Sequence, residues 1–240
     1  MNTIPRGKLY LIPITLGENE PLEVLPITVK NTIAEIDDYI VENEKTARKF
    51  IKSICPEKVQ ATLRLSTLNK HTQIEEHKKM LQACLEGRNT GIMSESGCPG
   101  VADPGAVIVK IAHEMGIQVI PLVGPSSILL ALMASGMNGQ SFAFNGYLPI
   151  DKSEKKSALK NLEKLSDDKN QTQIFIETPY RNNKLLEDML QILQPNTHLC
   201  VAADITLETE YIKTLRVQDW KKTKVDLHNR PTIFILHKFK

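Results

Sequence analysis

The segment from Met93 to Gly105 has the composition that points most directly to ligand binding. Three Gly and two Pro among its thirteen residues exclude a regular helix or strand and predict a stiff, tight loop. The loop follows an apolar run at Thr90–Met93, which predicts a strand, and precedes helical spacing across Pro104–Met115. Open α/β sheets bind small molecules at loops that leave the carboxyl ends of strands, so we expect a ligand here.

Further segments along the chain also have residues suited to ligand binding. Gly124-Pro125-Ser126-Ser127 opens an apolar helix predicted at Ile128–Ser135, and free backbone N–H groups at a helix start suit a carboxylate. Glu177 and Asp204 each follow a predicted strand, so we expect both to serve a pocket and not merely to be solvated loop acids.

Metal binding and cysteine chemistry are not indicated. The four cysteines are scattered, no two of them have CxxC spacing, and no His, Cys and Asp cluster has the spacing of metal ligands. Cys98 lies on the first loop, where no histidine or other base is near it in sequence, so we expect a small loop side chain and not a nucleophile. We predict no metal.

Composition is that of an ordinary soluble protein. The chain has 240 residues, of which 41% are hydrophobic and 24% charged, with aromatic residues at only 5%. A net charge of +2 excludes a strongly basic nucleic-acid binder by bulk charge, although a local basic patch remains compatible. No apolar run approaches the roughly 20 residues of a membrane span, and residues 1–10 carry no apolar signal region. We expect no membrane association and a cytoplasmic location.

Predicted strands and helices alternate throughout, which indicates the α/β class. We expect two domains, residues 1–120 and 121–240. A polar connector is expected at Pro149–Lys156, and a helix follows at Ser157–Leu165. Thr209–Val217 and Thr232–His237 are expected to be strands of a mixed sheet.

Segment order along nearly the whole chain resembles the tetrapyrrole-methylase-like superfamily of S-adenosylmethionine (SAM) dependent methyltransferases. It is most similar to the ribosomal RNA small-subunit methyltransferase I branch, which methylates a ribose 2′-hydroxyl. One matching segment alone would be weak, but six or seven in the right order are specific. The matching segments are Leu9–Gly17, Glu42–Lys45, His71, Ser94–Gly105, Val119–Gly136, Gly146–Pro149, Ile174–Arg181 and Asp204–Glu210.

The resemblance implies two α/β domains, distinct from the Rossmann methyltransferases, with SAM in the cleft between them and a homodimer as the assembly. It also implies which positions hold the cofactor. These positions are Thr15, Ser96, Gly97, Cys98, Val101, Ala102, Ser126, Ser127, Glu177, Asp204, Ile205, Pro231 and Thr232.

The chain departs from the ribosomal branch in four segments. Glu42-Asn43-Glu44-Lys45 replaces Glu-Asp-Thr-Arg, Glu95–Pro99 replaces Asp-Ala-Gly-Thr-Pro, and Asn229-Arg230-Pro231 replaces Lys-Gly-Glu. Ile14-Thr15-Leu16 replaces Thr-Pro-Ile at the first turn. The cofactor positions survive these changes, so the departures bear on the acceptor more than on methyl transfer.

Methyl transfer from SAM requires mainly an oriented acceptor and exclusion of water, and a hydroxyl acceptor benefits from a general base. Polar candidates for such roles are Glu42, Asp103 and Arg181, the last suited to a phosphate or carboxylate. Three functions stay open: methylation of ribosomal RNA or a related acceptor, methylation of a corrin or porphyrin precursor or another small acceptor, and non-catalytic SAM binding. We expect RNA before a tetrapyrrole, because the matched loops contain few arginines.

Overall fold

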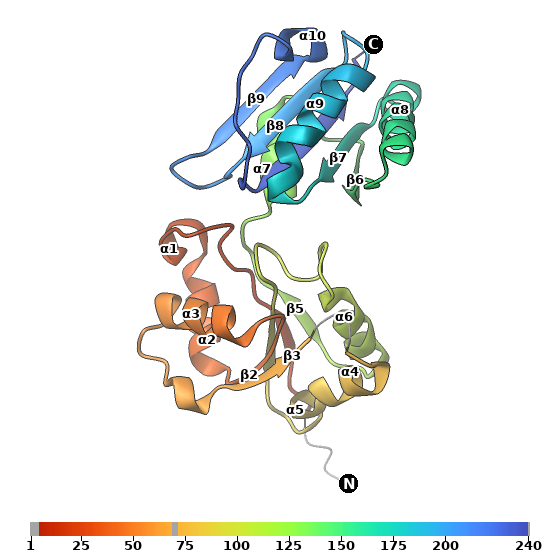
Figure 1. Cartoon of the computed structure of the whole chain (residues 1–240). Helices are drawn as coiled ribbons and strands as arrows, with labels where there is room; N and C mark the ends of the chain where they lie inside the picture. Colours follow the sequence, from red (N-terminus) through yellow and green to blue (C-terminus); the bar gives the residue numbers. More distant parts are fainter. Residues whose placement is uncertain (1–4, 69–71, 240) are drawn as a thin grey trace. The chain divides into compact units, whose positions relative to one another are not determined.

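The computed structural model describes residues 5–68 and 72–239, which fold into two compact units divided between Ser126 and Ser127 (Figure 1). Each unit is an α/β structure with its own five-stranded sheet. The division follows Ser126, whereas the sequence placed it near residue 120, because the strand at Val119–Pro121 pairs with the first strand of the chain.

The first sheet is entirely parallel and has the strand order β3-β2-β4-β1-β5. Its strands are β1 (Leu9–Leu11), β2 (Asp38–Val41), β3 (Arg64–Thr67), β4 (Thr90–Met93) and β5 (Val119–Pro121). The helices are α1 (Pro21–Val24), α2 (Ile27–Glu35), α3 (Glu44–Ile54), α4 (Ile74–Met80), α5 (Gln82–Leu85) and α6 (Gly105–Glu114), with a 3-10 turn at Gln60–Thr62.

Alternation along β2 shows how the sheet buries both faces. Tyr39 and Val41 pack in one core with residues of α2 and α3, whereas Ile40 packs in a second core with residues of α6. Helices thus cover both faces, and the carboxyl ends of all five parallel strands meet at one edge. That edge is where an open parallel sheet binds ligands.

The second sheet is mixed and has the order β6-β7-β10-β8-β9. Only β6 and β7 run parallel, and the remaining neighbours are antiparallel. The strands are β6 (Phe142–Tyr147), β7 (Thr172–Ile176), β8 (His198–Ala203), β9 (Tyr211–Arg216) and β10 (Thr232–His237). The helices are α7 (Ser127–Ser135), α8 (Lys152–Lys169), α9 (Asn182–Ile192) and α10 (Val217–Trp220), with the 3-10 turn η2 at Pro179–Arg181.

One core of the second unit joins the sheet to α8, α9 and α10, with Trp220, Phe175 and Phe234 among its largest fully buried side chains. Helix α7 contacts β9 and β10, and its Ser135 carbonyl accepts a hydrogen bond from Thr214 Oγ1.

Two sequence predictions of elements were wrong in extent. The connector expected at Pro149–Lys156 ends early, because the Asp151 carboxylate accepts the N–H groups of Ser153 and Glu154 and starts α8 at Lys152. The spacing of apolar residues across Thr72–Glu86 predicts one helix before β4, but the structure has two, α4 and α5, separated at Leu81. The mixed sheet and the α/β class are confirmed.

Candidate cofactor-binding site

Three loops of the first unit meet at the carboxyl edge of its sheet. The N–H of Ile14, after β1, donates to the Gly97 carbonyl over 3.0 Å. Cys98 Sγ lies 3.4 Å from the carbonyl oxygen of Pro125, which follows β5. Ser96 Oγ is 3.5 Å from the Leu16 carbonyl oxygen. The structure thus brings together the predicted positions Thr15, Ser96, Gly97 and Cys98.

Backbone conformation explains the glycines in these loops. Gly97 has φ +67°, and a Cβ there would lie 3.1 Å from Leu16 Cδ2 and 3.2 Å from the Pro125 carbonyl oxygen. A Cβ on Gly124 would lie 2.3 Å from the Pro13 ring, so the turn before Ser126 approaches the first strand too closely for any larger residue. Glycine lets these loops pack on one another.

Ala102 adopts a left-handed conformation, with φ +62°. Such a conformation costs about 1–3 kcal/mol for a residue with a side chain and is concentrated at functional sites. Four residues of the second unit share it, namely Asn170, Asp204, Thr206 and Asn229, with φ of +50°, +50°, +73° and +57°. Two of these five residues, Ala102 and Asp204, are predicted cofactor positions, and Thr206 lies two residues after Asp204.

Asp103 organises the glycine-proline loop. Its Oδ2 accepts the N–H of Gly100 over 2.8 Å and its Oδ1 accepts the N–H of Gly105 over 2.6 Å. Burial raises the pKa of Asp103, and these backbone hydrogen bonds act in the opposite direction. Both oxygens serve the loop, so a positioning role fits Asp103 better than proton transfer. Val101 and Ala102 lie exposed between the bonded positions.

Glu42 follows β2 and is half-buried beside the same loop. Its Oε1 accepts the N–H of Glu95 over 3.1 Å. Burial raises the pKa of Glu42, and the negative charges of Asp103 and Glu95 add to the rise. A carboxylate with a raised pKa, held at a loop predicted to bind ligand, has the properties of a general base.

A hollow of about 500 Å³ adjoins these loops within the first unit. Thr15 lines one side of it, and Glu95 and Thr46 line another, joined by a hydrogen bond of 2.7 Å from Thr46 Oγ1 to Glu95 Oε1. Lys49, which the sequence did not single out, lines the hollow as well and donates to Glu18 over 2.7 Å. Apolar and charged side chains thus both line the hollow beside the predicted loop.

The second unit places Glu177 and Arg181 together after β7. Arg181 Nη2 lies 2.7 Å from Glu177 Oε1, which also accepts the N–H of Thr178. Burial raises the pKa of Glu177, but the hydrogen bonds from Arg181 and Thr178 outweigh it, so this pKa lies below its ordinary value. The carboxylate is therefore charged and fixed in position.

Asp204 and the segment before β10 form another connected group in the second unit. Asp204 Oδ2 accepts hydrogen bonds from Arg230 Nε over 2.7 Å and from Thr209 Oγ1 over 2.9 Å. The backbone N–H of Asp204 donates to the Pro231 carbonyl, and Thr232 is the first residue of β10. Ile205 is buried beside them. These contacts unite the four predicted positions Asp204, Ile205, Pro231 and Thr232.

Arg230, like Lys49, lies beside predicted positions but was not itself predicted as a site residue. It stands where the segment departs from the ribosomal branch, and its guanidinium also donates to the Thr209 carbonyl over 2.6 Å. A lone arginine among loop residues gave no signal without the pairing of β8 with β10.

The remaining predictions concern Ser127, metal binding, Cys98 and His71. Ser127 is the first residue of α7, directly after Ser126. Among the described residues, no group of three or more His, Cys, Asp and Glu side chains is arranged to hold a metal. Burial raises the pKa of the Cys98 thiol, which disfavours its thiolate. His71 lies outside the described residues.

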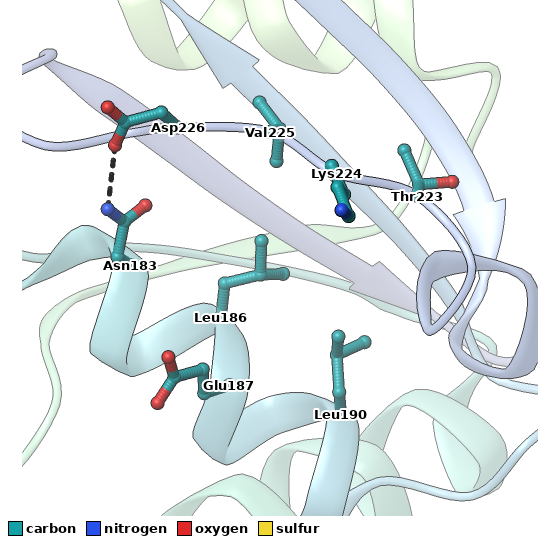
Figure 2. Close-up of a pocket in the computed structure, with 8 residues that line it drawn as sticks. All are labelled: Asn183, Leu186, Glu187, Leu190, Thr223, Lys224, Val225 and Asp226. Atoms are coloured by element: carbon teal, nitrogen blue, oxygen red, sulfur yellow. Dashed lines mark hydrogen bonds between the residues drawn. The ribbon is translucent and has the colours of Figure 1, made fainter.

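A separate hollow of about 560 Å³ lies in the second unit between α9 and the segment 223–226 (Figure 2). Leu186, Leu190 and Val225 face it, and Asn183 Nδ2 closes one end by donating to Asp226 Oδ1 over 2.7 Å. No predicted site residue lines this hollow. It is therefore distinct from the loops described above.

Comparison with known proteins identifies the family. The sequence pattern of the Tetrapyrrole (Corrin/Porphyrin) Methylases matches residues 8–220. The chain belongs to the tetrapyrrole methylase family. Proteins named ribosomal RNA small subunit methyltransferase I are similar over most of the chain. The one from Bacillus subtilis (strain 168) is 31% identical over 204 residues, and the one from Halalkalibacterium halodurans is 30% identical over 201 residues.

These alignments cover 85% and 84% of the chain, respectively, and the chain spans only 65% of the length of either relative. The relative from Buchnera aphidicola subsp. Acyrthosiphon pisum is 26% identical over 243 residues, and the chain spans 82% of its length. The recognised resemblance to the family is thus confirmed.

Solved structures confirm the tetrapyrrole methylase fold. The methyltransferase CobJ superimposes with a TM-score of 0.64 at 17% identity, covering 97% of this chain and 94% of that one. Diphthine synthase superimposes with a TM-score of 0.66 at 12% identity, covering 95% and 88%. Uroporphyrin-III C-methyltransferase from Thermus thermophilus, solved in complex with S-adenosylhomocysteine, gives 0.55 at 17% identity, covering 97% and 98%.

Proposed function

We propose that this tetrapyrrole methylase family member transfers a methyl group from SAM to RNA, at a ribose 2′-hydroxyl. The observation that carries the proposal is the hydrogen-bonded assembly of the three first-unit loops at the carboxyl edge of a parallel sheet. The similarity to proteins named ribosomal RNA small subunit methyltransferase I supports RNA as the acceptor.

The predicted cofactor positions fit SAM. Gly124 has no room for a side chain, and a Cβ at Gly97 would press on Leu16 and the Pro125 carbonyl, so backbone N–H and carbonyl groups line the loops there. Ser126 and Ser127 stand at the start of the nine-residue helix α7, where backbone N–H groups favour a carboxylate. Asp204 and Glu177 offer fixed carboxylate oxygens to an ammonium or to ribose hydroxyls. We propose that the thirteen predicted positions named from the sequence hold the cofactor.

When bound, SAM supplies a methyl group activated on a sulfonium. The chain must then orient the acceptor hydroxyl and accept its proton. We assign proton acceptance to Glu42, whose raised pKa and fixed Oε1 suit a base. Asp103 keeps the loop in shape, and Arg181, held by Glu177, is placed to contact an RNA phosphate.

Transfer of labelled methyl from SAM tests the proposal. Ribosomal RNA from a strain that lacks this protein should accept label, whereas ribosomal RNA from the parent strain should not. Labelling of a corrin or porphyrin precursor instead would replace the RNA acceptor with a tetrapyrrole. Binding of SAM without transfer to RNA, tetrapyrrole or protein fractions would identify a non-catalytic SAM-binding protein.

A homodimer is also proposed. Helix α7 exposes Leu129 and Met133, which lie four residues apart and therefore on the same face, with Met133 78% exposed. Apolar side chains of this size on one helix face favour association, and a symmetric dimer is the commonest assembly.

No helix in the ranges 5–68 and 72–239 is both long and apolar enough to cross a membrane.

A further inference from the structure

Two exposed tyrosines stand out in a chain that is poor in aromatic residues. Aromatic residues make up only 5% of the sequence, yet Tyr147 and Tyr180 are each 60% exposed. Exposing a large ring to water forgoes the free energy of burying it, so a pair of such rings at one place marks a contact surface.

Both rings arise from the same edge of the second sheet. Tyr147 is the last residue of β6 and pairs with Ile176, the last residue of β7. Tyr180 lies four residues after Ile176, in η2. The β6–β7 register shifts between Phe144 and Tyr147, where Gly146 has φ +62°. This irregularity sets the orientation of Tyr147 at the strand end.

Arg181 contacts the ring of Tyr180. Its guanidinium carbon lies 5.2 Å from the centre of the Tyr180 ring, within the range of a cation–π contact. The carboxylate of Glu177 raises the pKa of Arg181. Tyr147 reaches the same strand end, because it lies opposite Ile176, the residue that precedes Glu177. Arg181 Nε is buried without a hydrogen-bond partner among the described residues. One nitrogen is thus anchored on Glu177 and another donor is unused.

We propose that Tyr147, Tyr180 and Arg181 form a stacking platform for an unpaired nucleobase of the RNA acceptor. The proposal rests on the proposed function. Aromatic faces and a guanidinium plane stack on any base that is splayed out of a helix, and the cation also attracts the adjoining phosphate. A ribose 2′-hydroxyl can be reached only if its nucleotide is held in place, and the platform provides that hold without reading a sequence.

Binding of a fluorescein-labelled, single-stranded RNA of mixed sequence and about 12 nucleotides tests the platform. Fluorescence anisotropy should show that Tyr147→Ala and Tyr180→Ala each weaken binding by about 5- to 150-fold, the loss expected for one stacked base. Tyr147→Phe and Tyr180→Phe keep the ring and should keep most of the affinity. Phe142→Ala removes an exposed ring from the opposite end of β6 and should leave RNA binding unchanged.

Isothermal titration of S-adenosylhomocysteine on the same proteins separates the outcomes. Unchanged affinity for this ligand in both alanine variants, together with lost RNA affinity, is the expected result. Loss of S-adenosylhomocysteine binding in either variant would mean that the rings hold the adenine of the cofactor. That result overturns the platform. If both alanine variants bind RNA as tightly as the unaltered protein, the platform is refuted but the proposed function is not. Cofactor binding without any RNA binding by the unaltered protein refutes the proposed function, and the platform with it.

Discussion

Arg230 Nε lies 2.7 Å from Asp204 Oδ2, and this pair joins the loop after β8 to the segment that precedes β10. The Asp204 side chain is 8% exposed and that of Arg230 25% exposed, so the pair is largely shielded from water. Asp204 is held there in a left-handed conformation, with φ +50°. The contact therefore fixes a strained loop that we assign to the cofactor.

Replacing Arg230 by Ala should destabilise the protein and weaken S-adenosylhomocysteine binding together. The variant leaves Asp204 without its ionic partner and removes the donors to the Thr209 and Asp226 carbonyls, a loss of about 1–3 kcal/mol. Urea unfolding and isothermal titration measure the two effects. Arg216→Ala, which removes an arginine from an exposed position at the end of β9, serves as the control. Normal ligand affinity in Arg230→Ala would remove this loop from the cofactor site.

Gly97 and Gly100 offer a matched pair of substitutions on one loop. Both have a left-handed φ, +67° and +87°, so Ala introduces comparable backbone strain at each. A Cβ at Gly97 meets Leu16 and the Pro125 carbonyl, whereas a Cβ at Gly100 meets nothing within 4 Å. Gly97→Ala should therefore weaken S-adenosylhomocysteine binding more than Gly100→Ala, and Gly97→Val should abolish it. Equal affinities of the two Ala variants in titration would contradict this assignment.

The Glu177–Arg181 pair predicts a particular pH dependence of stability. The folded-state pKa of Glu177 lies below its ordinary value of 4.5, so the pair stabilises the protein above that value. This contribution disappears as the pH falls through the lowered pKa, because the folded state must then protonate Glu177. Arg181→Ala should therefore lower the urea midpoint at pH 7, and the deficit should shrink as the medium becomes more acidic.

A double variant supplies the check on that explanation. Adding Glu177→Gln to Arg181→Ala removes the unpaired buried charge and should recover part of the lost stability at pH 7. Lys160→Ala removes a cation from the exposed surface of α8 and should change the midpoint little. A deficit in Arg181→Ala that stays constant from pH 7 to acid would show that the ion pair is not its cause.

Association through α7 can be tested by placing a charge on its exposed face. Multi-angle light scattering of the unaltered protein should give twice the 27.0 kDa of one chain. Met133→Glu should give a monomer, because a carboxylate buried in an apolar interface has no partner. Gln218→Glu adds the same charge on α10 and should remain dimeric. A 27 kDa species for the unaltered protein at micromolar concentration would refute the dimer.

Local composition was enough to predict the loops and the strand β10. The Gly and Pro content of Ser94–Gly105 predicts an irregular loop, and the apolar run Thr232–His237 matches β10 residue for residue. Both features are decided within a few neighbouring residues. By contrast, β2 is only four residues long and begins at Asp38, whose charge interrupts the apolar pattern. That aspartate is tolerated because Arg64 and Arg88 bind its carboxylate.

Contacts between distant residues could not be predicted in the same way. Arg230 and Asp204 are brought together by the antiparallel pairing of β8 with β10, in which Thr232 lies opposite Ala203. The role of Asp103 also depended on its surroundings, since only the folded loop shows both oxygens bound to backbone N–H groups. A sequence shows that Glu42, Asp103 and Arg181 are polar. Their hydrogen bonds are needed to assign Glu42 as the base and Asp103 as the residue that stabilises the loop.

Glu42 and Asp103 should therefore respond differently to the loss of a carboxylate. Glu42→Gln keeps an oxygen for the Glu95 N–H but cannot take a proton, so methyl transfer should fall about 10²- to 10⁴-fold with little change in S-adenosylhomocysteine affinity. Asp103→Asn retains one carbonyl oxygen for two N–H groups, at Gly100 and Gly105, so it should loosen the loop and weaken that affinity.

The pH dependence of turnover distinguishes proton acceptance by Glu42 from a structural role. Because burial raises the pKa of Glu42, its basic form accumulates only as the pH rises through that raised value. The rate of the unaltered protein should rise over this range, and the residual rate of Glu42→Gln should be flat there. Glu95 and Asp103 carry the negative charges that act on Glu42, so Glu95→Gln should shift the rise to lower pH without abolishing it. A pH profile of Glu42→Gln that parallels that of the unaltered protein would assign the proton to another acceptor.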